Sequence, residues 1–274
     1  MSADFLAGMA ASSRQRVAAA RRLHSQADLW RRAQSSPPPP TLQLSSQRFD
    51  VIAEVKLRSP AAGVLGAGDA DIAARVQRYA AAGAAAVSVL TEPDRFEGSL
   101  EHLQQAAHAL RAAGVPAMRK DFLVDPWQVA EARVAGAGGI LIIVRMLQRA
   151  ELDALIKAAQ QFALFVLIET FDAADIQVAK DLLSTHGSAT PLLVGINSRD
   201  LTSLKVVPGR LEELVELLPA GLPRVAESGV ATAEDAARLA RAGYDLALIG
   251  SALMTADNPA MLLAAMIAAG RRAR

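Results

Sequence analysis

Residues 116–144 read PAMRKDFLVDPWQVAEARVAGAGGILIIV and contain the unit that decides the fold. The mostly apolar run Pro116–Arg119 predicts a short strand, and Ile140–Val144, which holds only Ile, Leu and Val, predicts a second. Ala135-Gly136-Ala137 precedes the second strand and places Gly where a helix must end in the left-handed region. The segment therefore predicts a strand–helix–strand unit with a right-handed crossover.

The same unit recurs along the chain. Similar glycine junctions lie at Ala82-Gly83-Ala84, Ala113-Gly114-Val115 and Ala242-Gly243-Tyr244, each ahead of a predicted strand. Helices are expected between the strands, for example at 70–82, 100–113 and 232–242. The predicted strands are Val51–Val55, Ala86–Leu90, Pro116–Arg119, Ile140–Val144, Leu164–Ile168, Leu192–Ile196, Arg224–Ala226 and Leu246–Ile249.

Several of these runs are nearly continuous in Val, Ile and Leu, which is typical of parallel strands buried on both faces. Eight strand–helix units favour closure into one barrel, because an open doubly wound sheet usually has fewer strands. The 274 residues also match the usual size of such a barrel. We therefore predict the α/β class, with a single (βα)8 TIM barrel.

The segment ahead of the first strand has a different composition. Residues 1–34 are rich in Ala and Arg and predict one or two helices, and Pro37–Pro40 ends them. We therefore expect an N-terminal helical extension with a Pro-rich connector at 1–48 and the barrel at 49–274. Met1–Arg22 lacks the continuous apolar stretch of a secretory signal, and no run of about 20 apolar residues lacks a charge. These features predict a cytoplasmic protein.

Composition excludes several classes of function. With no cysteine, the chain has neither a disulfide framework nor a thiolate nucleophile. The net charge is +1 with interspersed signs, so no nucleic-acid partner is expected. The four histidines lie away from the strand ends and predict no metal site. Met254 and Met261 are expected to pack in the core beneath the last helices.

Charged and polar residues gather where the predicted strands end, which is where (βα)8 barrels place their active sites. Glu54 and Lys56 are two residues apart, so both can point to the same face of the first strand. Charges aimed into an apolar barrel mouth are costly unless they are paired or used. They therefore predict either a catalytic cluster or an ion-pair network that closes the barrel top. The cluster comprises Glu54, Lys56, Lys120, Glu169, Asn197 and Glu227.

Small residues follow the last two strands. Ser228-Gly229 comes after the seventh and Gly250-Ser251 after the eighth. In (βα)8 barrels these loops often bind phosphate through backbone N–H groups and a short helix N-terminus. They predict a phosphate-binding end of the pocket.

Taken together, these residues are similar to the indole-3-glycerol-phosphate synthase family from Phe49 to the C-terminus. No single block is specific, but the combination is. The matching blocks are Ile52-Ala-Glu-Val-Lys56 with Ser59-Pro60, Ser88-Val-Leu-Thr-Glu-Pro93 with Phe96 and Gly98-Ser99, Arg119-Lys-Asp-Phe122 with Asp125-Pro126, Gly195-Ile-Asn-Ser-Arg-Asp-Leu201, Ala226-Glu-Ser-Gly229 and Ile249-Gly-Ser-Ala-Leu-Met254.

The resemblance implies that 1-(2-carboxyphenylamino)-1-deoxyribulose 5-phosphate is closed to indole-3-glycerol phosphate with loss of CO2 and water, in tryptophan biosynthesis. It implies no metal and no organic cofactor. Lys120 resembles the acid that protonates the ketone oxygen. A lysine can do this near neutral pH where partial burial and cationic neighbours lower its pKa. Glu54, Lys56 and Glu169 resemble the groups that share the later acid and base roles.

The resemblance also assigns binding roles. Lys56 is placed to pair with the anthranilate carboxylate, Asn197 and Glu227 to orient hydroxyls and catalytic groups, and Arg199 to position this neighbourhood through charge-assisted hydrogen bonds. The expected phosphate ligands are Ser59, Ser228, Gly229, Gly250 and Ser251. The expected apolar walls are Phe96, Phe122, Leu141, Ile143, Leu201 and Leu248.

Three positions depart from the family pattern and affect the fit of the substrate more than the reaction class. Leu57 stands where Arg is common, Ala61 where Ser is frequent, and Thr170-Phe171 where Val-His is frequent. Two other functions stay open. One is a lyase that releases free indole, or another barrel isomerase that acts on a sugar phosphate; the other is a catalytically silent barrel that serves as a binding or scaffold subunit. The expected partner is a small phosphorylated molecule, with no nucleic acid or membrane, for a monomer or weak homodimer.

Overall fold

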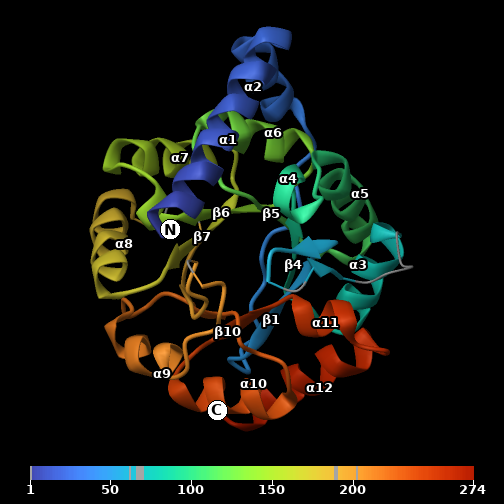
Figure 1. The fold of residues 1–274 in the computed structure, drawn as a ribbon. Coiled ribbons are helices and arrows are strands. Elements are labelled where there is room, and N and C mark those ends of the chain that lie inside the picture. The colour runs from blue at the N-terminus through green and yellow to red at the C-terminus, as the bar shows by residue number, and fades with distance from the viewer. Residues whose placement is uncertain (1, 62, 66–70, 188–190, 202) are drawn as a thin grey trace.

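The computed structural model describes residues 2–61, 63–65, 71–187, 191–201 and 203–274. Within these ranges, eight parallel strands alternate with helices and close into a barrel (Figure 1). β1 pairs with both β4 and β10, and these pairings close the barrel. The barrel strands are β1 (Asp50–Val55), β4 (Ala86–Leu90), β5 (Ala117–Lys120), β6 (Gly139–Ile143), β7 (Phe165–Thr170), β8 (Leu192–Asn197), β9 (Arg224–Glu227) and β10 (Leu246–Ile249).

The predicted fold class is confirmed, and each predicted strand lies within one or two residues of an observed one. The four predicted glycine junctions all have positive φ, between 67° at Gly114 and 108° at Gly243. Glycine adopts this backbone conformation without the steric cost that a Cβ brings. The helix expected at 70–82 is observed at Ile72–Ala81, and Ala70 lies outside the described residues.

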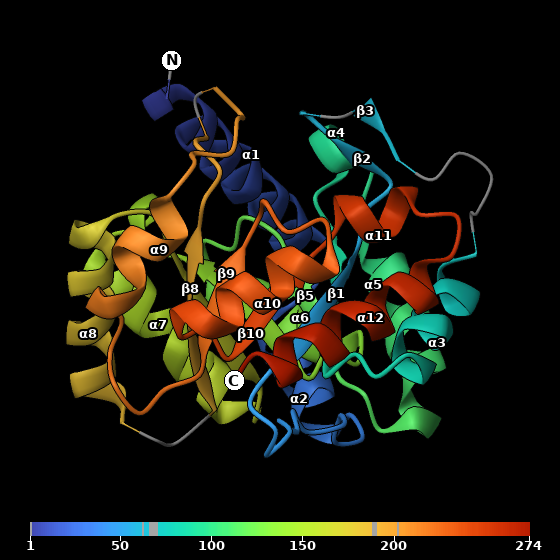
Figure 2. The same cartoon turned by 90° about the horizontal axis from the view of Figure 1, so that it is seen from below.

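Helices surround the barrel, and two of them precede it in sequence. In Figure 2 the N-terminal end of α1 lies at the same edge as the short β2–β3 hairpin (Arg58–Ser59 and Gly63–Val64), while α2 lies at the opposite edge. The division into parts at 1–48 and 49–274 stays a prediction. The helices are α1 (Ser2–Leu23), α2 (Gln26–Ser35), α3 (Ile72–Ala81), α4 (Pro93–Phe96), α5 (Leu100–Leu110), α6 (Pro126–Val134), α7 (Arg149–Gln161), α8 (Ala173–His186), α9 (Arg210–Leu214), α10 (Ala233–Ala242), α11 (Ser251–Thr255) and α12 (Pro259–Arg272), with 3-10 turns η1 (Arg111–Ala113), η2 (Val144–Met146) and η3 (Val215–Leu217).

Strand alternation divides the core in two. Along β1, Val51, Ala53 and Val55 point outward and join the large apolar cluster between the barrel and its helices. Ile52 points inward and joins a second cluster that fills the barrel beneath the strand ends. Inward-pointing residues near the C-terminal strand ends therefore project toward the mouth, above a packed floor.

One core prediction is wrong. Met254 is buried as expected, but Met261 is 69% exposed. In α12 the buried face runs through Leu263, Met266, Ile267 and Gly270, and Met261 lies on the opposite face. Among the helices of the described ranges, none is long and apolar enough to span a membrane.

Candidate active site

The C-terminal ends of the barrel strands surround a cavity of about 410 Å3. Five of the polar residues predicted for the site come from the last two residues of a strand, on β1, β5, β7, β8 and β9. All eighteen residues predicted for the site line this cavity: Glu54, Lys56, Ser59, Phe96, Lys120, Phe122, Leu141, Ile143, Glu169, Asn197, Arg199, Leu201, Glu227, Ser228, Gly229, Leu248, Gly250 and Ser251.

Lys120 and Glu169 form the central ion pair. The Lys120 Nζ donates to Glu169 Oε2 at 3.1 Å, and Asn197 Nδ2 donates to Glu169 Oε1 at 2.7 Å. Each oxygen of Glu169 therefore has a donor. The Asn197 side chain is itself fixed, because the Arg199 backbone N–H donates to its Oδ1 at 2.9 Å.

Glu54 and Lys56 form a second pair, with Lys56 Nζ 2.8 Å from Glu54 Oε1. Both line the cavity, as their spacing predicts, while Val55 between them packs in the outer core. Gly250 lies directly beside this pair, and a Cβ there would overlap the Glu54 carboxylate. Glycine at this position therefore leaves the space that the ion pair occupies.

Glu227 is the carboxylate with the poorest set of partners. Its side chain is buried, and neither carboxylate oxygen has a hydrogen-bond partner among the described residues. Among the described residues, the cation that faces it is Lys120, with Nζ 3.9 Å from Glu227 Oε2. Burial, followed by the negative charge of Glu169, raises the pKa of Glu227 well above the ordinary value, and Lys120 offsets only part of this effect.

The environment of Lys120 corrects one expectation. Burial by itself would lower its pKa, but the carboxylates of Glu169, Glu227 and Glu54 outweigh burial and raise the pKa. The prediction that cationic neighbours lower the pKa of Lys120 is therefore wrong. The groups around Lys120 are carboxylates, and they come from three other strands. Lys120 is an ammonium group in the free pocket, with its side chain 18% exposed.

An aromatic wall stands beside these charges. The rings of Phe96 and Phe122 lie 6.1 Å apart, and Phe5 of α1 meets Phe122 edge-on at 6.0 Å. Phe5 lines the cavity but was not predicted to do so. Its position on an amphipathic helix ahead of the barrel gave no sign that the helix reaches the mouth.

Small residues from the loops after β9 and β10 also line the cavity. Ser228 and Gly229 are both left-handed, with φ of 68° and 73°, so the chain turns sharply after β9. Gly250 precedes α11, which begins at Ser251. Ser59 lies in β2 and is mostly buried. All of these residues line the cavity, and they follow β9, β10 and β1, which are neighbours in the barrel.

Arg199 lines the cavity, but its guanidinium donates to the Leu204 backbone carbonyl at 2.5 Å. This contact stabilises the loop after β8, in which Arg199 also pairs with Val206. Leu204 and Val206 line the cavity as well and were not predicted. The signal was weak, because these apolar residues follow a polar segment rather than a strand end.

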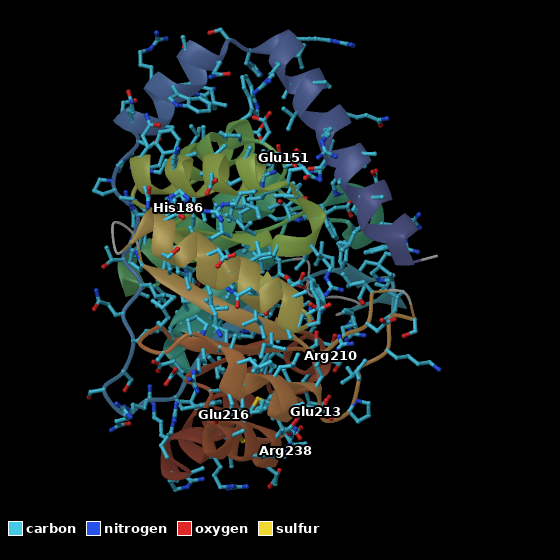
Figure 3. All side chains as sticks on the ribbon, turned by 90° about the vertical axis from the view of Figure 1, so that its left-hand side faces the viewer. Glu151, His186, Arg210, Glu213, Glu216 and Arg238 are labelled. Atoms are coloured by element: carbon cyan, nitrogen blue, oxygen red, sulfur yellow. The ribbon has the colours of Figure 1, made fainter. Side chains whose placement is uncertain are left out.

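The histidines lie away from this site, as predicted. His186 is on α8 at the outside of the barrel (Figure 3), where its Nε2 lies 2.7 Å from Asp153 Oδ1 of α7. In the described ranges, no group of three or more His, Asp or Glu side chains is arranged to hold a metal ion.

A parallel barrel whose mouth holds paired ammonium and carboxylate groups beside an aromatic wall defines an enzyme of acid–base chemistry on a small molecule. The family model for indole-3-glycerol phosphate synthase matches residues 6–266. The chain therefore belongs to the indole-3-glycerol phosphate synthase family.

Individual relatives agree with this assignment. An indole-3-glycerol phosphate synthase of Opitutus terrae is 39% identical over 95% of this chain and 97% of the relative. One of a Parafrankia species is 41% identical over 83% and 81%.

Among solved structures, 3-hexulose-6-phosphate synthase from Salmonella typhimurium has a TM-score of 0.61 at 11% identity, covering 82% of this chain and all of that one. Thiamine phosphate pyrophosphorylase from Pyrococcus furiosus has a TM-score of 0.58 at 16% identity, covering 83% and 96%. At these identities, the two likenesses show the barrel fold alone.

Proposed function

We propose that this protein is an indole-3-glycerol-phosphate synthase, a carboxy-lyase of tryptophan biosynthesis. It closes the ring of 1-(2-carboxyphenylamino)-1-deoxyribulose 5-phosphate with loss of CO2 and water. The observation that carries this proposal is the Lys120 ammonium, held at 3.1 Å from Glu169 in a cavity with an aromatic wall. Ring closure needs a proton donor for the ketone oxygen beside an apolar surface for the arene.

Lys120 donates its proton to the ketone oxygen while the aromatic carbon attacks the carbonyl carbon. The anionic neighbours keep the ammonium charged in the free pocket, so the donor is loaded when substrate arrives. Glu169 accepts a hydrogen bond from Lys120 and so holds the ammonium group in position, and the Asn197 amide in turn fixes Glu169. A positioned donor lowers the barrier without a reorganisation step.

Decarboxylation and dehydration follow ring closure. Lys56 pairs with the substrate carboxylate before it leaves as CO2, and this neutralises a charge that the apolar wall cannot solvate. The 3-hydroxy group then leaves as water while a base removes a proton from the adjacent ring carbon. Glu54, Lys56 and Glu169 share these later acid and base roles, and Asn197 and Glu227 orient the hydroxyls.

The phosphate lies against the backbone N–H groups of the last two loops. Ser59, Ser228, Gly229, Gly250 and Ser251 hold it. The anthranilate ring packs against the apolar side of the cavity, formed by Phe96, Phe122, Leu141, Ile143, Leu201 and Leu248. Arg199 positions this neighbourhood through the loop after β8.

The reaction needs no metal and no organic cofactor, since proton transfers and positioning carry every step. The protein acts in the cytoplasm as a monomer or weak homodimer. Its partner is the phosphorylated substrate, and neither nucleic acid nor a membrane takes part.

The purified protein tests this function directly. Addition of 1-(2-carboxyphenylamino)-1-deoxyribulose 5-phosphate is expected to produce a rise in indole fluorescence. Chromatography is expected to show indole-3-glycerol phosphate as the product and no free indole. A folded protein without turnover would refute the proposal, and free indole would point to a different lyase.

A further inference from the structure

The charges inside the cavity do not pair one to one. Among the described residues, three carboxylates of the cluster, Glu54, Glu169 and Glu227, face the two ammonium groups of Lys56 and Lys120. Lys56 is paired with Glu54 at 2.8 Å and Lys120 with Glu169 at 3.1 Å. Glu227 is left with only a shared and distant interaction, at 3.9 Å from Lys120.

The other charged residues of the lining do not supply the missing partner. The Asp121 carboxylate is taken up by Arg16 and Arg119, and the Arg199 guanidinium donates to a backbone carbonyl. Both oxygens of Glu227 are buried without a hydrogen bond in the described part of the chain. Burial without a hydrogen-bond donor disfavours an ionised carboxylate, and the one ammonium near Glu227, that of Lys120 at 3.9 Å, is already paired with Glu169.

The barrel leaves dedicated space for this side chain. Gly195 on the neighbouring strand β8 lies against this carboxyl group, and a Cβ there would overlap Glu227 Oε1. The register places Asn197 beside Glu227, so the carboxyl group sits next to the residues that fix Glu169. The Glu227 side chain is therefore accommodated in a buried position beside Glu169 and Asn197.

We propose that Glu227, beyond orienting the hydroxyls, carries a proton in the resting pocket and is the acid that donates it to the leaving hydroxyl, which leaves Glu169 as the base of the dehydration step. The inference rests on the proposed function, because this step exists only in that reaction. The C–O bond of the 3-hydroxyindoline breaks, and its oxygen leaves as water with the Glu227 proton. Glu169 removes a proton from the neighbouring CH2 carbon, and that C–H electron pair forms the double bond of the indole ring.

The same geometry returns the proton. After dehydration Glu227 is ionised and Glu169 is protonated. The Lys120 Nζ is within reach of both, 3.1 Å from Glu169 and 3.9 Å from Glu227. Lys120 gives a proton to Glu227 and regains one from Glu169, so both carboxyl groups return to their resting states. The Lys120 proton spent on the ketone oxygen is replaced from solvent, which balances the one proton consumed when a substrate carboxylate leaves as CO2.

Glu227→Gln separates this role from a positioning role, because it keeps the shape and the zero charge but has no acidic proton. CO2 release and indole formation are followed together in single turnovers. We expect indole formation to fall at least ~100-fold and CO2 release less than ~10-fold, so that the decarboxylated 3-hydroxyindoline accumulates. Glu216→Gln, an exposed change on η3 at the outside of the barrel (Figure 3), is the matched control and is expected to leave both rates unchanged. Equal losses of both rates, or no loss, would overturn the proposal.

Infrared spectroscopy reads the resting proton without any turnover. At neutral pH the unmodified protein is expected to show the deuterium-sensitive C=O band of a protonated carboxylic acid. Glu227→Gln is expected to lack the band and Glu227→Asp to retain it. Absence of the band from the unmodified protein overturns the proposal even if Glu227→Gln does not fold. Failure of the proposed function is a separate result, because the unmodified protein would then turn over no substrate whether or not the band is present.

Discussion

Lys120 and Asp121 are adjacent in sequence, yet their side chains belong to two charged clusters of opposite character. The cluster around Asp121 faces the helices, and its carboxylate accepts hydrogen bonds from Arg16, Arg119, Thr91 and the Phe122 backbone. The cluster around Lys120 faces the cavity and includes a carboxylate, Glu227, with no hydrogen bond among the described residues.

This difference in hydrogen bonding indicates that the cluster around Asp121 stabilises the fold, whereas the cluster around Lys120 serves catalysis. Both carboxylate oxygens of Asp121 accept hydrogen bonds and its side chain is fully buried, so it keeps no hydrogen-bonding capacity for a ligand. α1 and the strand end of β5 are joined through this network, since Arg16 comes from α1. The inner cluster is open to the cavity and keeps unused hydrogen-bonding capacity, which a substrate can take up.

Asp121→Asn is expected to give the largest effect, on stability. It removes the carboxylate that Arg16 and Arg119 share and leaves the buried Arg119 guanidinium with one carboxylate among the described residues, Glu131 at 3.2 Å, so the free energy of unfolding should fall by ~3 kcal/mol. Urea unfolding measures this change. Asp257→Asn, at an exposed position, is the control and should change stability by less than ~0.5 kcal/mol. An equally small effect of Asp121→Asn would mean that the outer cluster is not structural.

Lys120→Ala is expected to show its effect in catalysis. Loss of the proton donor should lower turnover by at least ~100-fold, equivalent to ~2.7 kcal/mol in the activation barrier. The indole fluorescence assay measures it, with the exposed Lys157→Ala on α7 as the control. Near-normal turnover in Lys120→Ala would refute its assignment as the donor.

Arg16→Ala should have a smaller effect than Asp121→Asn, because Arg119 remains on the carboxylate. The Arg16 side chain is 26% exposed, so the loss of its charge-assisted bonds should cost ~1–2 kcal/mol of unfolding free energy. Arg22→Ala, exposed near the end of α1, provides the comparison. If the two variants unfold at the same urea concentration, the Arg16–Asp121 pair does not anchor α1.

The smallest expected effect is the change in the free energy of unfolding with pH, which should have opposite signs for Asp121 and Glu227. Burial raises the pKa of Asp121, but Arg119, Arg16 and Thr91 outweigh it and lower the pKa. Its stabilisation is therefore complete above the unfolded pKa of about 3.9 and is lost as pH falls toward the folded pKa. The raised pKa of Glu227 acts in reverse: stability declines as pH rises above about 4.3 toward the folded pKa. The free energy of unfolding is measured with urea between pH 3 and pH 8. Asp121→Asn should reduce its dependence on pH below about 3.9, and Glu227→Gln should reduce it above about 4.3. Unchanged slopes in both variants would contradict both pKa shifts.

Much of the fold could be predicted because the strands are nearly pure apolar runs and four helices end at left-handed glycines. The strand ends were predicted too short at Glu169 and Glu227, where the apolar pattern stops but the backbone pairing continues. A polar side chain that points inward at a barrel mouth interrupts hydrophobicity without interrupting the strand.

The site was predictable as a set of residues but not as a set of partners. Lys120, Glu169 and Glu227 lie on three strands, and only closure of the barrel brings them within 4 Å. The sequence therefore did not reveal that the neighbours of Lys120 are anionic. It also did not reveal that Phe5 lines the cavity, because Phe5 lies on a helix more than 100 residues before its neighbour Phe122. Sequence spacing carries no information on contacts of this kind.

The free energy of unfolding of Lys120→Ala tests most directly whether the inner cluster is built for chemistry rather than for stability. Water entering the cavity can solvate the carboxylates that lose the ammonium, so the variant should unfold within ~1 kcal/mol of the unmodified protein while its turnover collapses. A loss of ~3 kcal/mol, matching that expected for Asp121→Asn, would show that both clusters hold the barrel together and would contradict the distinction.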